Sequence, residues 1–170
     1  MFGFNNTKNC IMIDKILEIP YKEYNSLQEL DQEDRELCEA CIEALSGSYA
    51  PYSGFNVGAA LRLADGSIIK GSNQENAASP SGLCAERTAM FAANSANPGM
   101  PMTSIAIVGS QNGKICPDIT SPCGACRQVM AEYQKLGGRD MSVIFYSAGR
   151  ILKFDKVDYI LPFIFDNLDS

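Results

Sequence analysis

Three cysteines in two short motifs place the strongest constraint on how this chain can fold. The motifs are Cys84-Ala-Glu86 and Pro122-Cys123-Gly-Ala-Cys126, which are far apart in the sequence. A Cys-x-x-Cys pair at a helix start can chelate one zinc ion, and a third cysteine at another helix start completes three thiolate ligands. A fold that uses all three must bring two helix starts together.

The absence of histidine narrows the chemistry of such a site. No histidine occurs anywhere in the sequence, which removes Ser-His-Asp and Cys-His catalysis and every metal site that contains histidine. Three protein ligands leave the fourth tetrahedral position of zinc for water, as in catalytic sites. Glu86 is then expected to take a proton from that water and deliver it to a substrate.

The charge of the site also needs an explanation. Helix N-termini favour anionic sulfur, but three thiolates exceed the two positive charges of zinc and should weaken its ability to acidify water. Arg87 and Arg127 each lie one residue after a motif. We expect both to hydrogen-bond to sulfur and withdraw charge, although either residue could instead be an ordinary surface charge.

Other interpretations of these residues are less specific. A closed structural zinc site would need a fourth protein ligand, and no further cysteine lies in a matching motif. Cys38-Glu-Ala-Cys41 is a second Cys-x-x-Cys pair, but both cysteines lie on the apolar face of a predicted helix, so we expect them to pack in the core. Glu86 could be a surface carboxylate that complements a helix dipole.

Composition limits the class of protein and its partners. A chain of 170 residues with 46% hydrophobic content fits one compact domain. A net charge of −6 leaves no basic stripe for nucleic acid, so a small, uncharged or weakly charged ligand fits better. No signal peptide or membrane span is recognisable in the sequence. The seven cysteines, an odd number, indicate reduced thiols or metal ligands rather than a disulfide framework. Both observations predict a cytoplasmic protein with no membrane partner.

Periodicity and breakers predict alternating helices and strands. We expect an N-terminal extension over residues 1–25, disordered over about the first ten residues, and a single domain over 26–170. Helices are predicted from Asp31 to just before Gly47, over 84–93 and over 124–136, and strands over 55–63, 67–71, 104–109, 141–146 and 150–154. This order predicts a mixed sheet covered by helices in layers.

The two motifs, extended to Cys-Ala-Glu-Arg and Pro-Cys-Gly-Ala-Cys-Arg-Gln, resemble the short-chain form of the cytidine deaminase family. The resemblance runs from about Leu30 to Phe165 and includes Tyr-Ala-Pro-Tyr-Ser at 49–53, Phe-Asn-Val-Gly-Ala-Ala at 55–60 and Asn-Gln-Glu-Asn at 73–76. It implies an α/β fold, a three-layer α/β/α sandwich with a mixed five-stranded sheet. It also implies one zinc per chain and hydrolytic deamination of cytidine and deoxycytidine to uridine and deoxyuridine plus ammonia, in pyrimidine salvage.

The resemblance also implies which residues bind the substrate. Phe55 would pack against the nucleoside, Ala85 would contribute to the same site, and Asn73 and Glu75 would bind the ribose hydroxyls. An amide and a carboxylate two residues apart on an extended segment point the same way, so they can bracket vicinal hydroxyls.

The C-terminal Leu-Pro-Phe-Ile-Phe at 161–165 is similar to a family segment whose aromatic residue stacks on the base in a neighbouring subunit. This implies a homotetramer with shared active sites and gives Phe165 a role in substrate binding. Ser79 departs from the family, which commonly has an aromatic residue there.

Two other functions compete with this prediction. A deaminase of blasticidin S-type aminonucleosides shares the metal motifs but differs over residues 73–76. A non-enzymatic zinc-binding or redox module could be built on Cys123-x-x-Cys126, but neither metal binding nor thiol exchange requires Glu86.

Overall fold

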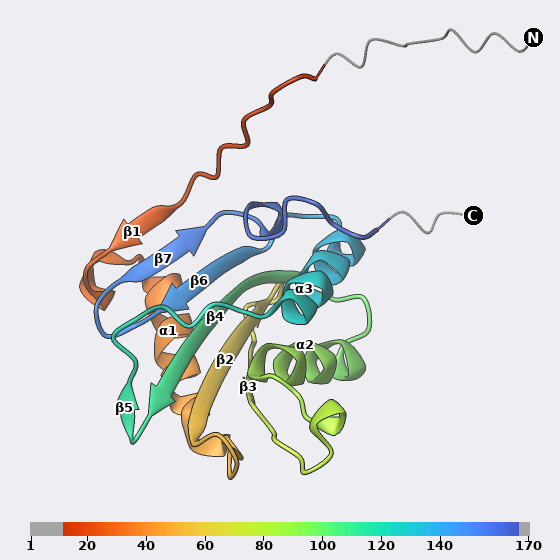
Figure 1. Ribbon diagram of the computed structural model, residues 1–170. Helices are drawn as coiled ribbons and strands as arrows, with labels where there is room; N and C mark the ends of the chain where they lie inside the picture. Colours follow the sequence, from red (N-terminus) through yellow and green to blue (C-terminus); the bar gives the residue numbers. More distant parts are fainter. Residues whose placement is uncertain (1–11, 167–170) are drawn as a thin grey trace, which may run out of the picture.

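A computed structural model describes residues 12–166. One sheet lies between two layers of helices, which confirms the predicted α/β/α sandwich (Figure 1). The helices are α1 (Gln32–Ala44), α2 (Ala85–Ala96) and α3 (Gly124–Gly137). The longer strands are β2 (Phe55–Leu63), β3 (Ile68–Ser72), β4 (Met102–Gln111), β6 (Ser142–Tyr146) and β7 (Ile151–Phe154). Within the described residues, no helix has the length and apolar character needed to cross a membrane.

The sheet is mixed, as predicted. Its strand order is β1-β7-β6-β4-β2-β3, with β1 at Lys22–Tyr24, and the two-residue β5 (Lys114–Ile115) pairs with the end of β4. The β4–β6 pair is parallel and the other pairs are antiparallel. The five predicted strands are confirmed, and β1 and β5 are two short additions that the sequence did not predict.

Strand β1 owes its place to contacts with β7. The two strands pair antiparallel, and Lys22 Nζ donates a hydrogen bond to Asp155 Oδ1 at 2.9 Å. Glu23 lies 3.7 Å from Arg150 across the same pair. Because these partners are distant in sequence, local periodicity could not indicate them. The predicted division at residue 25 stays a prediction, and the predicted disorder of the first ten residues lies outside the described part of the chain.

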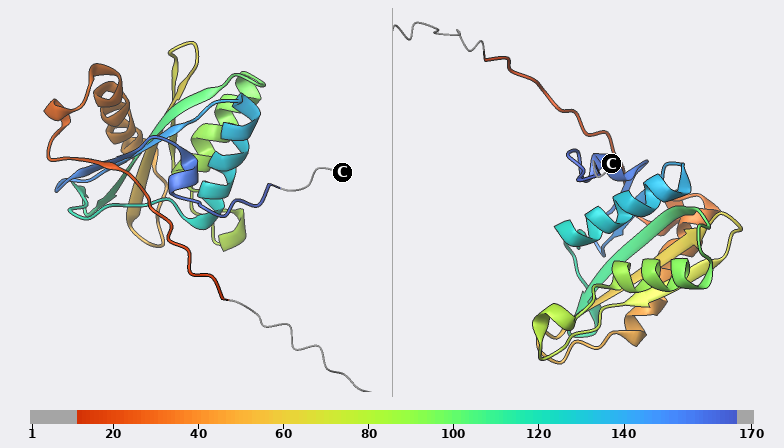
Figure 2. Two further views of the ribbon diagram at one scale, coloured as in Figure 1. Left: turned by 90° about the horizontal axis from the view of Figure 1, so that it is seen from above. Right: turned by 90° about the vertical axis from the view of Figure 1, so that its right-hand side faces the viewer.

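The sheet separates two hydrophobic cores, and successive side chains of the central strand β4 point alternately into one core and the other. Figure 2 shows α1 on one face of the sheet and α2 and α3 on the other. Ile105 and Ile107 belong to the core beneath α2 and α3, whereas Ala106 and Val108 belong to the core beneath α1. All four are fully buried, as expected for a strand covered on both sides. Cys38 and Cys41 of α1 are also fully buried, which confirms their predicted packing role.

Several local signals in the sequence mark where the elements begin and end. The side chain of Asp31 caps α1 by accepting a hydrogen bond from the Asp34 N–H at 2.9 Å. Gly138 ends α3 in the left-handed region at φ 62°. The N-caps of α2 and α3 are Cys84 and Cys123, so both cysteine motifs lie at helix starts as predicted.

Helix α2 lies directly on the backbone of β3 because Gly71 has no side chain. A Cβ atom at Gly71 would lie 2.5 Å from the carbonyl oxygen of Ala85 and 2.5 Å from the nitrogen of Ala89. Both distances are far below van der Waals contact. The start of α2, which carries Cys84 and Glu86, is therefore positioned by a close approach that only glycine permits.

Replacing Gly71 with alanine should displace α2 from the sheet. We expect the Gly71→Ala variant to lose about 1–3 kcal/mol of unfolding free energy, the usual cost of overpacking a core. Chemical denaturation of the zinc-loaded protein measures this. Gly124→Ala is the matched control, because a Cβ there would have no contact within 4 Å beyond its chain neighbours and the nearby backbone of its own helix. Equal stability of the two variants would contradict the proposed close packing of α2.

Candidate active site

The three cysteines of the two motifs meet at one point. Cys84 comes from the start of α2, and Cys123 and Cys126 come from the first turn of α3. Their sulfur atoms all lie within 4.8 Å of one another, with 3.9 Å between Cys84 and Cys123 and 3.5 Å between Cys123 and Cys126. The predicted convergence of the two helix starts is thus observed.

This spacing fits a zinc ion. Zn–S bonds of about 2.3 Å in tetrahedral geometry separate two sulfur atoms by about 3.8 Å, close to the observed distances. Among residues 12–166, no further histidine, cysteine, aspartate or glutamate ligand joins the group. The three residues can hold one zinc and leave a coordination position for a ligand from outside the protein.

Arg87 of α2 supplies positive charge beside the three cysteine sulfur atoms. A hydrogen bond from the Cys126 thiol and contact with Arg87 lower the pKa of Cys84 to about 5, although burial acts in the opposite direction. The same hydrogen bond, with burial, raises the pKa of Cys126. Arg87 Nη2 lies 3.7 Å from Cys84 Sγ, which agrees with the contact to sulfur expected of this arginine. The positive charge of Arg87 therefore favours the thiolate form of Cys84.

Arg127 does not make the hydrogen bond to sulfur that the sequence predicted. Its Nε donates to the carbonyl oxygen of Pro122 at 2.9 Å, and its Nη1 donates to that of Ile160 at 2.8 Å. A guanidinium that bridges two carbonyl groups fixes the backbone just before Cys123 against the C-terminal segment. Within the described residues, Arg127 braces the loop rather than the sulfur atoms.

Glu86 lies in the first turn of α2, beside the cysteines. Its side chain is only 4% exposed and lines the same cavity as Cys84 and Cys123. Burial is the main cause that raises the pKa of this carboxyl group. A surface glutamate that merely complements the helix dipole would be solvated, so the burial of Glu86 argues against that alternative.

One cavity of about 590 Å³ connects the metal cluster to the residues expected to bind substrate. This volume is within the range of small-molecule sites. The cavity brings together the four residues that the sequence linked to the substrate site and that line it, namely Phe55, Asn73, Glu75 and Ser79. Its other lining residues are Tyr52, Val57, Gln74, Asn76, Ala77, Gly82, Leu83, Cys84, Glu86, Arg87, Thr120, Ser121 and Cys123.

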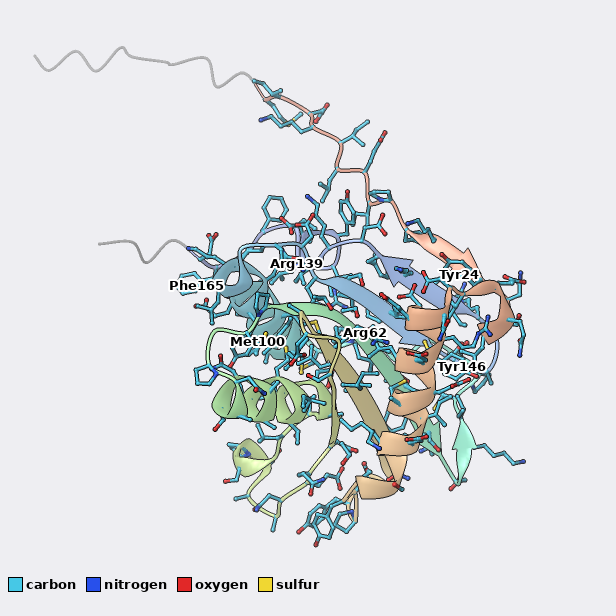
Figure 3. The ribbon with its side chains drawn as sticks, turned by 180° about the vertical axis from the view of Figure 1, so that it is seen from behind. Tyr24, Arg62, Met100, Arg139, Tyr146 and Phe165 are labelled. Carbon is cyan, nitrogen blue, oxygen red and sulfur yellow. The ribbon has the colours of Figure 1, made fainter. Side chains whose placement is uncertain are left out.

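Two residues expected at the substrate site lie elsewhere in this chain. Ala85 does not line the cavity, because its methyl group is fully buried in the core beneath α2. Phe165 is 69% exposed and lies beside α3, where Gln128 holds its backbone through two hydrogen bonds of 2.7 and 3.3 Å (Figure 3). Ala85 could thus meet a ligand only through its backbone, and Phe165 does not line the cavity of its own chain.

Sequence reasoning missed part of the cavity wall. Thr120 and Ser121 line it from the loop just before the second motif. A Cβ atom at Gly109 would lie 2.1 Å from Thr120 Oγ1 and 2.9 Å from the Phe55 ring, so this bare glycine makes room for both side chains. The position of these residues beside Pro122-Cys123, and a glycine within an apolar strand, were the available signals.

An α/β sandwich in which three convergent thiols lie beside a buried glutamate at a cavity defines the class of zinc-dependent deaminases. Residues 31–137 match the family model described as the cytidine and deoxycytidylate deaminase zinc-binding region. The chain therefore belongs to this family.

Individual relatives agree with the family match. A cytidine deaminase of Halalkalibacterium halodurans is 48% identical over 96 residues, which are 56% of this chain and 68% of that protein. A probable cytidine deaminase of Dictyostelium discoideum is 33% identical over 140 residues, with 80% and 88% covered. A crystal structure of cytidine deaminase from Burkholderia pseudomallei aligns with a TM-score of 0.62 at 40% identity and covers 76% of this chain and 97% of that one.

The two Cys-x-x-Cys pairs should respond differently to substitution. We expect the purified protein to hold about one zinc per chain and the Cys123→Ser variant to lose most of it, because two thiolates bind zinc far less tightly than three. Cys38→Ala is the matched control, since it removes the first cysteine of the pair buried under α1. Elemental analysis after gel filtration measures the zinc. Full zinc in Cys123→Ser would contradict this assignment.

Proposed function

We propose that this chain catalyses hydrolytic deamination of cytidine and deoxycytidine, which yields uridine or deoxyuridine and ammonia. The observation that supports this most is a single cavity that joins the three-thiol cluster, through Cys84 and Cys123, to buried Glu86 and to the polar pair Asn73 and Glu75. The first two groups supply hydrolytic chemistry, and the pair supplies recognition of a sugar. Membership of the deaminase family supports the same reaction.

In this proposal, Cys84, Cys123 and Cys126 hold zinc, which when bound acts as a Lewis acid that makes water nucleophilic near neutral pH. Glu86 accepts a proton from the attacking water and donates it to N3 of the ring as the new C–O bond forms at C4. Glu86 then carries the second proton of that water to the amino group, and the C4–N bond breaks to release ammonia. One water is consumed, and the carbonyl group of uridine remains.

The rest of the cavity would hold the nucleoside. The Phe55 ring offers an apolar surface to it, and Ala85 would contribute only backbone contacts. Glu75 accepts hydrogen bonds from the N–H groups of Tyr52 at 2.8 Å and Ser53 at 3.3 Å. Hydrogen bonds from Ser53 and Tyr52 lower the pKa of Glu75. Glu75 therefore stays a carboxylate, which can accept a hydrogen bond from a hydroxyl group of the substrate.

A blasticidin-type deaminase and a zinc-binding module without activity are the two alternatives to this function. A module without activity would have no use for a buried carboxyl group such as Glu86 beside the cluster. Deamination assays on cytidine, deoxycytidine, cytosine, adenosine and blasticidin S distinguish these functions from the proposed one. Turnover of the two cytosine nucleosides is the expected result.

Glu86 should be essential for turnover but not for metal binding. We expect Glu86→Gln to keep its zinc and to lose about 100-fold or more in kcat, because the amide cannot transfer protons. The fall in cytidine absorbance as uridine forms measures the rate. Glu33→Gln, at an exposed glutamate in the first turn of α1, is the matched control. Normal turnover by a zinc-loaded Glu86→Gln variant would overturn the role of Glu86.

The proposed oligomer is a homotetramer in which Phe165 reaches the active site of a neighbouring copy. Gln128 fixes the backbone of Phe165 while leaving the ring 69% exposed, so the ring is free to contact another chain. The tail also exposes Phe163, which is 89% exposed. We further propose a reducing compartment such as the cytoplasm, because zinc binding requires the three thiols to stay reduced, and a role in pyrimidine salvage.

If Phe165 stacks on the base in a neighbouring copy, its removal should weaken substrate binding. We expect Phe165→Ala to raise the KM for cytidine about tenfold, the usual cost of losing one aromatic stacking contact. Phe163→Ala removes an equal ring from the same tail and serves as the control. Sedimentation establishes the oligomeric state of each variant. An unchanged KM in an assembled Phe165→Ala oligomer would refute the shared-site arrangement.

A further inference from the structure

Ser48 makes contacts that neither the metal centre nor the cavity wall explains. It follows the short 3-10 turn Leu45–Gly47, and its hydroxyl oxygen lies 2.5 Å from Asn73 Oδ1 and 2.9 Å from Asn56 Oδ1. Ser48 is half-buried and is not one of the residues that line the cavity. A hydroxyl has one proton and donates to one oxygen only, so the shorter contact, to Asn73 Oδ1, receives it. The Asn56 amide is then oriented with its nitrogen, rather than its oxygen, toward the remaining lone pair of Ser48.

The amide of Asn73 is almost completely used within the protein. Its Oδ1 accepts a hydrogen bond from the Val57 N–H at 2.8 Å in addition to the one from Ser48, and its Nδ2 donates to the Phe55 carbonyl oxygen at 2.9 Å. An amide oxygen accepts two hydrogen bonds and an amide nitrogen donates two. Only one N–H of Asn73 remains for a ligand, so this residue faces the cavity as a donor and not as an acceptor.

Glu75 has the complementary character. Its Oε2 is occupied by the N–H groups of Tyr52 and Ser53, which leaves Oε1 as an acceptor. The free N–H donor of Asn73 and the free acceptor oxygen of Glu75 match a hydroxyl group, which can accept one hydrogen bond and donate another. This match rests on the proposed function, in which the ligand carries a ribose.

We propose that Ser48 is a positioning residue for the nucleoside. Its hydrogen bond adds a third tether to the Asn73 amide and occupies the lone pair that would otherwise face water. Donation to an amide oxygen also polarises the group and strengthens its remaining N–H as a donor. Ser48 therefore sets both the direction and the strength of the single hydrogen bond that Asn73 gives to the sugar.

The test compares Ser48→Ala with the wild-type protein, both loaded with zinc, on two nucleosides. We expect the KM for cytidine to rise about threefold to tenfold, the effect of one neutral hydrogen bond, with kcat nearly unchanged. With 2′,3′-dideoxycytidine, which lacks the 2′- and 3′-hydroxyls, the two proteins should have the same kcat/KM. A merely structural role would lower kcat/KM equally for both nucleosides, and that result would overturn the proposal.

Further variants keep the test decisive. Ser48→Cys keeps the size of the side chain but donates weakly, so it should behave as Ser48→Ala even if the alanine variant folds poorly, and Ser48→Thr should restore the wild-type KM. Ser46→Ala is the matched control, because Ser46 lies two residues away and donates only to the Glu43 carbonyl oxygen. Wild-type KM in Ser48→Cys would refute the role of Ser48 while leaving the deaminase function intact. Failure of the wild-type protein to turn over either nucleoside would instead refute the proposed function itself, and this proposal with it.

Discussion

The meeting of three thiol groups at two helix starts is the constraint on which the rest of the site depends. Three thiolates repel one another and exceed the charge of one zinc ion, so their surroundings must favour negative charge. The N-termini of α2 and α3 supply unpaired N–H groups and the positive ends of two helix dipoles. Arg87 adds a full positive charge beside Cys84. Both helices must therefore begin at the same place, which ties the metal centre to the packing of the whole sandwich.

Two glycines, which have no side chain, allow the helices and strands around the site to pack this closely. Gly71 lets α2 rest on β3, and Gly109 leaves room for Phe55 and Thr120 at the cavity wall. These close approaches fix the start of α2 relative to β3, and the polar pair Asn73 and Glu75 lies on the segment that follows β3. The metal end of the site is thus built on rigid elements, and at the sugar end Ser48 and neighbouring backbone groups hold the Asn73 amide.

The sequence predicted those features that depend on neighbouring residues. Alternation and helix caps such as Asp31 predicted the main elements, and the motifs predicted the convergence of Cys84 with Cys123. Features that depend on distant contacts were missed, because nothing local encodes them. Strand β1 exists through its pairing with β7, and Arg127 turns from sulfur to the Ile160 carbonyl, which belongs to a segment far along the chain.

The two ends of the cavity differ in physical character, and this difference separates catalysis from binding. At the metal end, Glu86 and Cys126 are buried and held on helices, so reactive groups are already in place before a ligand arrives. At the sugar end, Tyr52 is 63% exposed, and Glu75 relies on backbone N–H groups for its orientation. A ligand bound there would stay partly open to water unless a second surface covered it. Within the proposed tetramer, Phe165 of a neighbouring copy is such a surface, so assembly would change affinity for the nucleoside more than it would change the chemical step at Glu86.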